Sequence, residues 1–454
     1  MSSKKIQADF TVGSIPKQLI RFAIPFMLSN AMQLIYSMVD MAVVGKFVGS
    51  AGLSAVSNSS QIMNLCTMLC LGFCSAAQVL VAQSLGSGKK DQIGRIISTL
   101  LSAMLALCAV LIVFMVTMRH QIVRWVDIPP EAQSMALDYL VICGAGLMFT
   151  FGYNIVSSIF RGLGDSRHPF IFILIASVAN LVLDLLFTGY LGWGVAGAAA
   201  ATVIGQGISL IFSVTFLRRN REQIGLSEKM RLFSVDKQML RMLIKLGIPY
   251  AVQTAAVNLS MIFVNRLVNS LGVYPSAAFG VGVKIDDIAN KLAQGVMYAV
   301  SPMVAQNIAA QNKARVKKVF WSALIFSASL YFLFSLILLP FSRQLFSIFN
   351  DEPQVLELAP VFAAAVVWGF PAMALLRPCN GFLQGIGYAR MSMILGLLDG
   401  VVARIALSYL LGIPLQMGFT GFVIGFSIAA YANSVPGTIY FLSGRWEKRK
   451  TLIS

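Results

Sequence analysis

The sequence predicts an all-α membrane protein, with twelve transmembrane helices in two six-helix bundles related by an internal repeat. Apolar residues make up 57% of the 454 residues, charged residues only 12%, and the mean hydropathy is +0.77. These values lie outside the range of soluble globular domains. Short sequence patterns from the first half also recur in the second half at one nearly constant spacing. Composition therefore predicts the membrane class, and the recurrence predicts the two bundles.

Apolar segments long enough to cross a bilayer follow one another along the chain, given about 20 residues per span. We expect six spans in each half. In the first half they lie near residues 15–45, 52–80, 93–118, 133–160, 168–190 and 194–217, and in the second near 238–271, 276–303, 316–341, 355–383, 391–413 and 417–443. The first segment is too long for a secretion signal and lacks a small-residue cleavage site after it, so we expect it to be retained.

The two halves share patterns at an offset of 223 or 224 residues. Pro25 is matched by Pro249, and the glycines of RGLGDSR (161–167) are matched by those of QGIGYAR (384–390). Six helices per repeat is an even number, so both halves enter the membrane in the same sense, as parallel repeats do in transporters. We therefore expect one lobe with its linker over residues 1–225 and a second over 226–454, facing each other across a cleft.

The net charge of +17 is distributed as a topology signal rather than as a nucleic-acid surface. Most Lys and Arg residues fall in segments that alternate to one side of the predicted spans, and few fall on the other side. By the positive-inside rule, this places both termini in the cytoplasm. We expect no nucleic-acid partner and a multi-pass protein of the bacterial inner membrane.

A carboxylate lies within the first predicted span. In NAMQLIYSMVD (30–40), Asn30, Gln33, Ser37 and Asp40 recur at steps of three and four residues and share one stripe of a helix. A charge in hydrocarbon costs several kcal/mol, so Asp40 is a candidate functional residue. The alternative is that Asp40 only reaches the headgroups at the end of its helix.

The fifth predicted span supplies a second acid, because Asn180 and Asp184 stand four residues apart on one helix face. Two carboxyl groups in a poorly hydrated pocket cannot both ionise cheaply, so one is expected to take up and release a proton. The same oxygen atoms could instead hold sodium. Asn154, Ser157 and Thr202 are possible additional oxygen donors, or they serve only in helix packing.

The second half keeps a polar stripe in its first helix but has no acid there, so we expect ion chemistry to be confined to the first half. Lys284, Asp287 and Lys291 stand at steps of three and four residues and predict a self-neutralised ladder. Three arginines within the spans need partners, and two acids are candidates, but the sequence does not pair them. The arginines are Arg266, Arg377 and Arg404, and the acids are Asp286 and Asp399.

Other features suggest a bend and a substrate cleft rather than an enzyme. Pro25 removes a hydrogen bond within the first helix and either allows a hinge or fixes a packing kink. Two dispersed histidines and no paired acids in a long loop predict no catalytic cluster, and Cys66, Cys70 and Cys74 are interpreted as packing residues rather than as a metal site. Candidate cleft residues are Met32, Gln33, Tyr36, Ser37 and Met38.

The chain resembles the multidrug and toxic compound extrusion (MATE) transporters over nearly its whole length. The resemblance rests on IPFMLSN with its proline, VDMAVVGKFVG, GLGDSRHPF, NLVLDLLF, GVAGAAAATVIGQ, SPMVAQNIAAQN and LQGIGYAR, in this order and spacing. It implies V-shaped lobes and export of cationic or amphiphilic compounds in exchange for protons or sodium. Asp40, Asn180, Asp184 and Thr202 look like the first-lobe ion site of the DinF-like branch. Another branch couples through an acid in the seventh helix, and that helix has no acid here.

The sequence thus predicts a multidrug efflux antiporter that works by alternating access, with no cofactor, no metal beyond a possible sodium ion at Asp40, Asn180 and Asp184, and a monomeric state. The first alternative is a flippase for lipid-linked sugars or other lipids, for which the span arginines could bind pyrophosphate. A major facilitator transporter also has two six-helix halves, but the proline of the first helix and the loop at 161–169 weigh against it.

Overall fold

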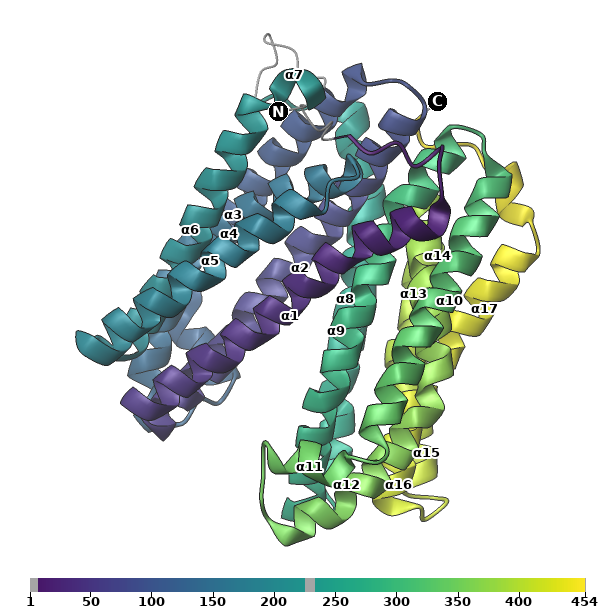
Figure 1. Cartoon of the computed structure of the whole chain (residues 1–454). Coiled ribbons are helices and arrows are strands. Elements are labelled where there is room, and N and C mark those ends of the chain that lie inside the picture. The colour runs from purple at the N-terminus through teal and green to yellow at the C-terminus, as the bar shows by residue number, and fades with distance from the viewer. Residues whose placement is uncertain (1–6, 225–232, 454) are drawn as a thin grey trace. The chain divides into compact units, whose positions relative to one another are not determined.

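In the computed structural model, which describes residues 7–224 and 233–453, the first half is helical (Figure 1). Its long helices begin and end within a few residues of the predicted spans. They are α1 (Ile15–Phe47), α2 (Ser50–Gly86), α3 (Asp91–Trp125), α4 (Pro130–Gly162), α5 (Arg167–Asp184) with a π-helical continuation η1 (Leu185–Tyr190), α6 (Gly194–Arg219) and the short α7 (Arg221–Ile224). Part of the predicted linker, residues 225–232, lies outside the described residues.

The second half repeats this order with more interruptions. It contains α8 (Lys237–Asn269), α9 (Val273–Ala309), α10 (Lys313–Leu338), α11 (Ser342–Ser347), α12 (Pro353–Val366), η2 (Val367–Gly369), α13 (Phe370–Gly385), α14 (Ala389–Leu397), η3 (Leu398–Ala403), α15 (Arg404–Gly412), α16 (Gly418–Ile428), α17 (Tyr431–Leu442) and η4 (Arg445–Lys448). Several predicted spans are thus built from two helices that continue each other, such as α12 and α13. The prediction of an all-α membrane protein is confirmed.

Eleven helical segments among the described residues are long and apolar enough to cross a membrane. The one predicted span absent from this set is the eighth, at residues 276–303, which corresponds to α9, a helix 37 residues long like α2 in the first half. It does not meet the same apolar criterion because Lys284, Asp286, Asp287 and Lys291 lie within it. A helix with both acidic and basic residues in its first half is therefore the one that composition alone does not identify.

The chain divides into two compact units. In α1 and in α8, the first part of the helix belongs to one unit and the rest of the helix belongs to the other. Unit 1 contains residues 1–8 and 28–248, and unit 2 contains residues 9–27 and 249–454. The changes of unit fall near Pro25 in α1 and at Pro249 in α8. Proline has no backbone N–H and interrupts the hydrogen-bond ladder of a helix. The expected lobes, divided at residue 225, differ from the units only in these exchanged segments and in residues 226–248.

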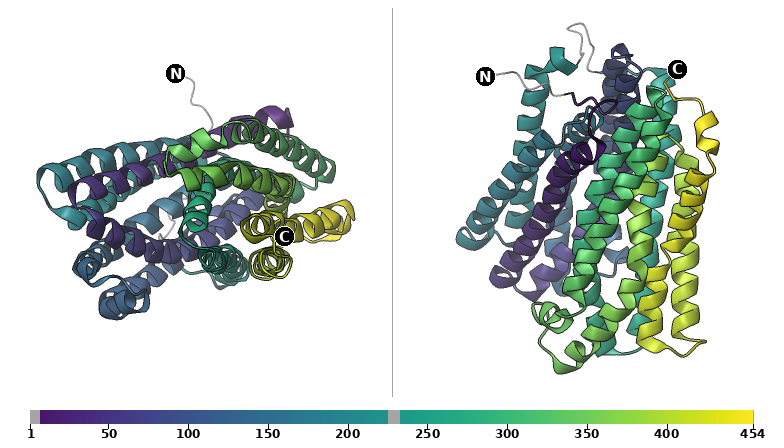
Figure 2. Two further views of the ribbon diagram at one scale, coloured as in Figure 1. Left: turned by 90° about the horizontal axis from the view of Figure 1, so that it is seen from below. Right: turned by 45° about the vertical axis from the view of Figure 1, so that its right-hand side comes forward.

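Within each unit, the long helices pack side by side (Figure 2). In unit 1, α4 packs against α2, α3 and α6, and α5 packs against α6. In unit 2, α9 packs against α10, α12 and α13, and α15 packs against α16. Small residues allow the close approaches that helices in membranes need.

Backbone geometry repeats between the halves at the predicted offset. A Cβ atom on Gly162 would lie 2.8 Å from the carbonyl oxygen of Gln78, and one on Gly385, 223 residues later, would lie 2.6 Å from that of Ser301. Both positions therefore require glycine for close helix contact. The left-handed conformation also recurs, with φ of 85° at Gly164 and 72° at Gly387. The glycines matched in the sequence thus carry matching structural roles.

Candidate functional site

The carboxyl groups of Asp40, in α1, and Asp184, at the end of α5, lie close enough to interact electrostatically, and no hydrogen bond joins them in the described structure. Asp184 is only 1% exposed, while Asp40 is partly exposed. The Oδ1 atom of each carboxyl group is buried and has no hydrogen-bond partner among the described residues. Buried oxygen atoms without a partner are costly. This pair therefore has room to accept a proton or a cation.

Asn180 extends the acid pair towards α6. Its side chain interacts with Asp184 one turn further along α5, and its Nδ2 donates to the hydroxyl of Thr202 at 3.4 Å. Tyr36, one turn before Asp40 on α1, is electrostatically coupled to both acids. Four of the polar residues singled out in the sequence, together with Tyr36, thus lie in one group formed by α1, α5 and α6.

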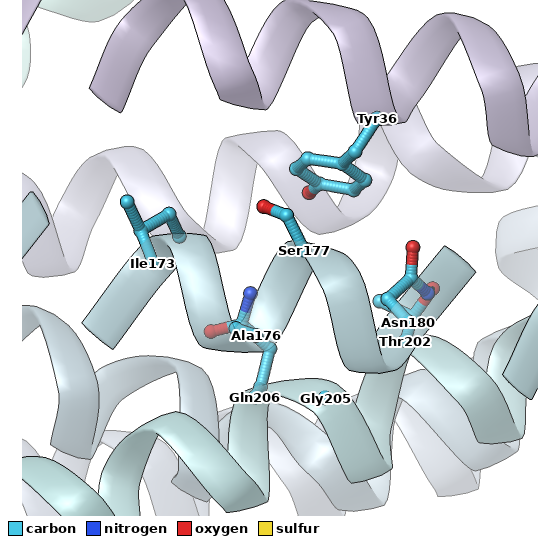
Figure 3. Close-up of a pocket in the computed structure, with 8 residues that line it drawn as sticks. All are labelled: Tyr36, Ile173, Ala176, Ser177, Asn180, Thr202, Gly205 and Gln206. Carbon is cyan, nitrogen blue, oxygen red and sulfur yellow. The ribbon is translucent and has the colours of Figure 1, made fainter. Parts of the chain in front are cut away.

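A small pocket lies beside this group (Figure 3). It has room for about one water molecule. In Figure 3, the ring of Tyr36 lies over Ser177, and Asn180 and Thr202 lie together at one end. The lining residues are Tyr36, Ile173, Ala176, Ser177, Asn180, Thr202, Gly205 and Gln206. The polar side chains therefore border a space that could admit a proton carrier such as water.

A change of helix type follows Asp184 directly. The α-helical hydrogen bonding of α5 gives way to the π-helical turn of η1 at Leu185, and the chain then leaves the helix with Leu191 N–H donating to the carbonyl of Leu186 at 2.8 Å. Single π-helical segments occur frequently at functional sites. In the second half, Asp399 lies inside the corresponding kind of segment, η3.

Asn154 and Ser157 are not linked to the acid pair by any contact among the described residues. Asn154 donates to the carbonyl of Thr150 in its own helix at 2.8 Å. Ser157 is fully buried near Tyr153, and its hydroxyl is without a hydrogen-bond partner in the structure as described. Both positions fit the packing alternative, and their role as ion ligands stays a prediction.

The proposed cleft residues are spread around α1 rather than gathered on one side of the site. Tyr36 lines the small pocket, while Gln33, Ser37 and Met38 are exposed and Met32 is partly exposed. An exposed Met in a span fits a lipid contact as well as a cleft contact. Substrate binding by these side chains therefore stays a prediction.

Several residues near the acids were not identified from the sequence. Tyr139 and Cys143 in α4 are electrostatically coupled to Asp40, and the Tyr139 hydroxyl lies 3.4 Å from the hydroxyl of Ser60. Their spacing of four residues on one helix face was available as a signal. Tyrosine and cysteine are common in buried helices, however, so the spacing alone does not distinguish them from packing residues.

The structure of the second half identifies the partners of two arginines that the sequence did not pair. Arg404 and Asp399 form a buried ion pair, with Nη2 3.1 Å from Oδ1. Arg377 instead donates to the side chains of Asn290 and Tyr331. The predicted ladder is incomplete, because Asp287 is attracted to Lys291 whereas the ammonium of Lys284 lies 5.9 Å from the ring centre of Phe349.

Metal binding by clustered side chains finds no support among residues 7–224 and 233–453, where no three His, Cys, Asp or Glu side chains form a group. A sodium ion has different requirements, since hydroxyl, amide and carboxylate oxygens all serve as ligands for hard cations. Asp40, Asn180, Asp184 and Thr202 supply such oxygens, and the two Oδ1 atoms without partners fit this use.

Comparison with known families gives two matches within the chain. The family model described as MatE matches residues 25–186 and again residues 249–410. The two matched ranges are displaced by the same 224 residues that the sequence repeat predicts. Each match begins at the proline of the first helix of its half, and together they cover more than half of the chain.

Curated relatives match almost end to end. The chain is 28% identical over 449 residues to a probable multidrug resistance protein, YpnP, of Bacillus subtilis, with 97% of this chain and 98% of the relative covered. It is 26% identical over 450 residues to a probable multidrug resistance protein, NorM, of Thermotoga maritima, with coverage of 97% and 95%.

Solved structures share the fold. The chain matches a crystal structure of MATE in complex with MaL6 at a TM-score of 0.92, with 20% identity and coverage of 99% of this chain and 100% of the other. It matches an outward-facing multidrug resistance MATE family transporter at a TM-score of 0.90, with 20% identity and the same coverage. At this identity, the likeness is one of fold.

Proposed function

Because this chain belongs to the MatE family of multidrug efflux transporters, we propose that it exports cationic or amphiphilic compounds in exchange for protons. The observation that carries the proposal is the facing pair of Asp40 and Asp184, with one buried carboxyl oxygen on each that has no partner among the described residues. Sodium is the alternative coupling ion at the same oxygens.

Proton exchange follows from the chemistry of two neighbouring carboxyl groups. When both are ionised, their charges repel in a site that little water reaches, so one proton is bound readily. A proton shared between them removes the repulsion and supplies a hydrogen-bond donor to a second carboxylate. Asn180 and Thr202 then orient Asp184 from the other side. The site thus has two charge states with different hydrogen bonding.

Movement of α1 would connect this change of charge to transport. Asp40 lies 15 residues after Pro25, about four helical turns, on the same continuous helix. We propose that the pair loads from the outside, that α1 shifts around Pro25 as Asp40 changes charge, and that this shift releases the substrate outward. The deprotonated site then accepts the next substrate from the cytoplasm or the inner leaflet.

The energy of one proton is sufficient for this exchange. One charge that crosses a membrane potential of about 100 mV yields about 2.3 kcal/mol, and a pH difference of about one unit adds about 1.4 kcal/mol. Together these support a gradient of a neutral substrate of roughly several hundredfold. No other energy source is required.

The proposal places the protein in the bacterial inner membrane as a monomer, with both termini in the cytoplasm, and assigns it no catalysis. The charge distribution supports the orientation. A lipid flippase is the alternative within the same two-bundle plan. Of the arginines that could hold its pyrophosphate, Arg404 is already paired with Asp399.

The test is transport of ethidium in proteoliposomes with an imposed pH gradient or an imposed sodium gradient. Asp40→Asn should abolish proton-driven transport while ethidium binding remains. Asp138→Asn, which removes an exposed acid of α4, is the matched control and should transport normally. Full proton-driven transport by Asp40→Asn would overturn the proposal. Transport driven by sodium alone would replace the proton by sodium at this site.

A further inference from the structure

Arg377 of unit 2 is a half-buried cation held by neutral groups. Its Nη2 donates to Oδ1 of Asn290 at 2.7 Å, and both Nε and Nη2 lie 3.4 Å from the Tyr331 hydroxyl. No carboxylate in the described part of the chain lies within ion-pair distance of it. Its Nη1 donates to no described residue. The guanidinium is therefore fixed in orientation but retains its charge and free donors.

Asn290 lies between Arg377 and the nearest buried acid, Asp286, which the guanidinium attracts without forming an ion pair. Its Nδ2 donates to Oδ2 of Asp286 at 2.7 Å, while its Oδ1 accepts from Arg377 and, at 2.9 Å, from Tyr331. The amide thus stands between the carboxylate and the guanidinium. Asp287, the other nearby acid, is attracted more strongly by Lys291 than by Arg377.

Arg404, in the same unit, is an arginine with a carboxylate partner and serves as a comparison for Arg377. It is 3% exposed, it is paired with Asp399 at 3.1 Å, and its guanidinium lies 5.0 Å from the ring centre of Phe426. That arrangement pairs the charge with a carboxylate, although Nε of Arg404 is buried without a hydrogen-bond partner among the described residues. Arg377 differs in all three respects, so a structural role alone does not account for it.

Helix α9 of unit 2 carries charges of both signs. Lys284 and Lys291 are exposed on α9, seven residues apart and hence on one face of the helix. Lys291 attracts Asp287, and Lys284 lies 5.9 Å from the ring centre of Phe349. Charges at this depth of a membrane protein face a water-filled cavity or a partner, because hydrocarbon does not solvate them.

An apolar pocket adjoins the same group. It has a volume of about 180 Å³ between α9 and α10, and Tyr331 belongs both to its wall and to the hydrogen bonds of Arg377. The other lining residues are Ala289, Leu292, Leu330, Leu333, Phe334 and Ile337. A cation with free donors thus lies next to an apolar space.

We propose that unit 2 carries a binding subsite for an anionic amphiphile. Arg377 binds the anionic group, and the pocket between α9 and α10 takes the apolar part. A guanidinium matches the planar geometry of a carboxylate and also binds phosphate well. The ligand is therefore a free carboxylate or phosphate amphiphile, or the anionic headgroup of a lipid with its chain. This subsite is separate from the acid pair of unit 1.

The test compares three probes with the same eight-carbon chain, namely octanoate, octyltrimethylammonium and octanol. Their binding is measured by titration calorimetry on the full chain in phosphatidylcholine nanodiscs, with empty nanodiscs subtracted. Octanoate should bind more tightly than the other two by about tenfold or more. Arg377→Gln should remove that preference and leave octanol unchanged. Equal binding of the three probes, or full octanoate binding by Arg377→Gln, would overturn the proposal.

A second variant keeps the arginine and changes only its neighbour. Asn290→Asp places a carboxylate where the amide accepts from Arg377, so it should neutralise the guanidinium and weaken octanoate binding. Lys318→Gln removes an exposed charge of α10 and is the matched control, with unchanged binding. If Arg377→Gln does not fold, Asn290→Asp decides the outcome, because full octanoate binding by it would count against the subsite.

Two further measurements follow. The first identifies whether the ligand is a lipid or a free amphiphile, and the second tests whether the subsite is independent of the acid pair proposed for antiport. Phosphatidylglycerol in the nanodiscs should weaken octanoate binding if a lipid headgroup occupies the subsite, and should leave it unchanged if the ligand is a free amphiphile. Asp40→Asn should bind octanoate like the wild type. Loss of octanoate binding in Asp40→Asn would show that the subsite is not separate from the acid pair, and would overturn the inference as stated.

Discussion

Unit 1 holds two carboxyl groups face to face, whereas unit 2 holds its acids beside arginine or amide partners. Neither Asp40 nor Asp184 forms an ion pair with a basic side chain in the described structure, but Asp399 is paired with Arg404, and Asp286 is bound by Asn290. The backbone of the repeat is nevertheless similar, as the close contacts of Gly162 and Gly385 show. The two halves thus have similar helix packing, but their buried acidic residues have different partners.

Residues matched by the repeat offset of 223 or 224 show which substitutions produce this difference in charge. Asn180 corresponds to Arg404 at a spacing of 224, and Asn154 corresponds to Arg377 at a spacing of 223. Each of these amides in unit 1 is replaced by a cation in unit 2. A carboxyl pair without a fixed counter-charge can change its protonation state, whereas Asp399 already has a cationic partner in Arg404. The comparison predicts that Asp40 and Asp184, rather than the arginine-paired Asp399, exchange protons during transport.

The largest expected effect on unit 2 comes from its buried ion pair. Asp399→Asn leaves the Arg404 charge buried without its partner and should lower the free energy of unfolding by about 3–5 kcal/mol. The measurement is thermal unfolding of the purified protein in detergent. The double variant Asp399→Leu/Arg404→Met removes both charges and should recover most of the loss. If Asp399→Asn were as stable as wild type, the pair would not be the closed structural contact described here.

Removal of the second acid of unit 1 should act on coupling rather than on stability. Asp184→Asn cannot share a proton with Asp40 as a second acid, so the substrate gradient should fall from roughly several hundredfold to none under the same driving force. Steady-state ethidium accumulation in proteoliposomes measures this. The stability of the variant should be close to that of wild type, because the neutral amide replaces a carboxyl group in a pair whose repulsion the shared proton already removes. Retained accumulation would mean that Asp40 alone carries the ion.

The shared packing predicts parallel effects in the two halves. Gly162→Ala and Gly385→Ala each force a Cβ atom against a backbone carbonyl oxygen, at 2.8 and 2.6 Å, and should destabilise by about 1–3 kcal/mol. The larger loss is expected at Gly385. Gly280→Ala is the control, since a Cβ there meets nothing within 4 Å and alanine favours the helix. Unequal effects, with one half unaffected, would break the structural equivalence of the repeats.

The smallest effect is expected at the exposed edge of unit 2, where Lys317 and Glu447 form an ion pair at 2.7 Å. The hydrogen bond from Lys317 lowers the pKa of Glu447 below its ordinary value. A lowered carboxyl pKa stabilises the folded protein above the unfolded-state pKa, and that contribution disappears as the pH falls through the folded-state pKa. The melting-temperature difference between wild type and Lys317→Gln should therefore vanish in acid. A difference that persists in acid would point to packing instead of charge.

Much of the fold follows from the sequence because membrane helices obey simple rules. Length, hydropathy and the repeated glycines located the long helices, and the steps of three and four residues placed polar side chains on shared faces. The grouping of Asn180 and Asp184 was foreseeable for this reason. Their approach to Asp40 was not given by spacing, because it depends on the packing of α1 against α5.

Other features depend on contacts that spacing does not encode. Asp399 and Arg404 are five residues apart, which is not a favoured α-helical spacing, and they meet because η3 is π-helical at Asp399. Arg377 forms hydrogen bonds with an amide and a phenol on two other helices. The exchanged helix segments could not be anticipated either, since a proline predicts a break in hydrogen bonding but not the unit in which each part packs.

The exchange of segments between the units has a consequence for biosynthesis. Unit 1 includes residues 237–248, which follow its own last long helix, and unit 2 includes residues 9–27, which are translated before most of unit 1. Neither unit is one continuous stretch of chain. The beginning of α1 must therefore wait in the membrane until α9 has been made before it can be packed, as the close contact of Met27 with Gly295 illustrates. Assembly of unit 2 thus needs segments translated both before and after most of unit 1, and a gene cut after residue 225 would separate each unit from a part of itself.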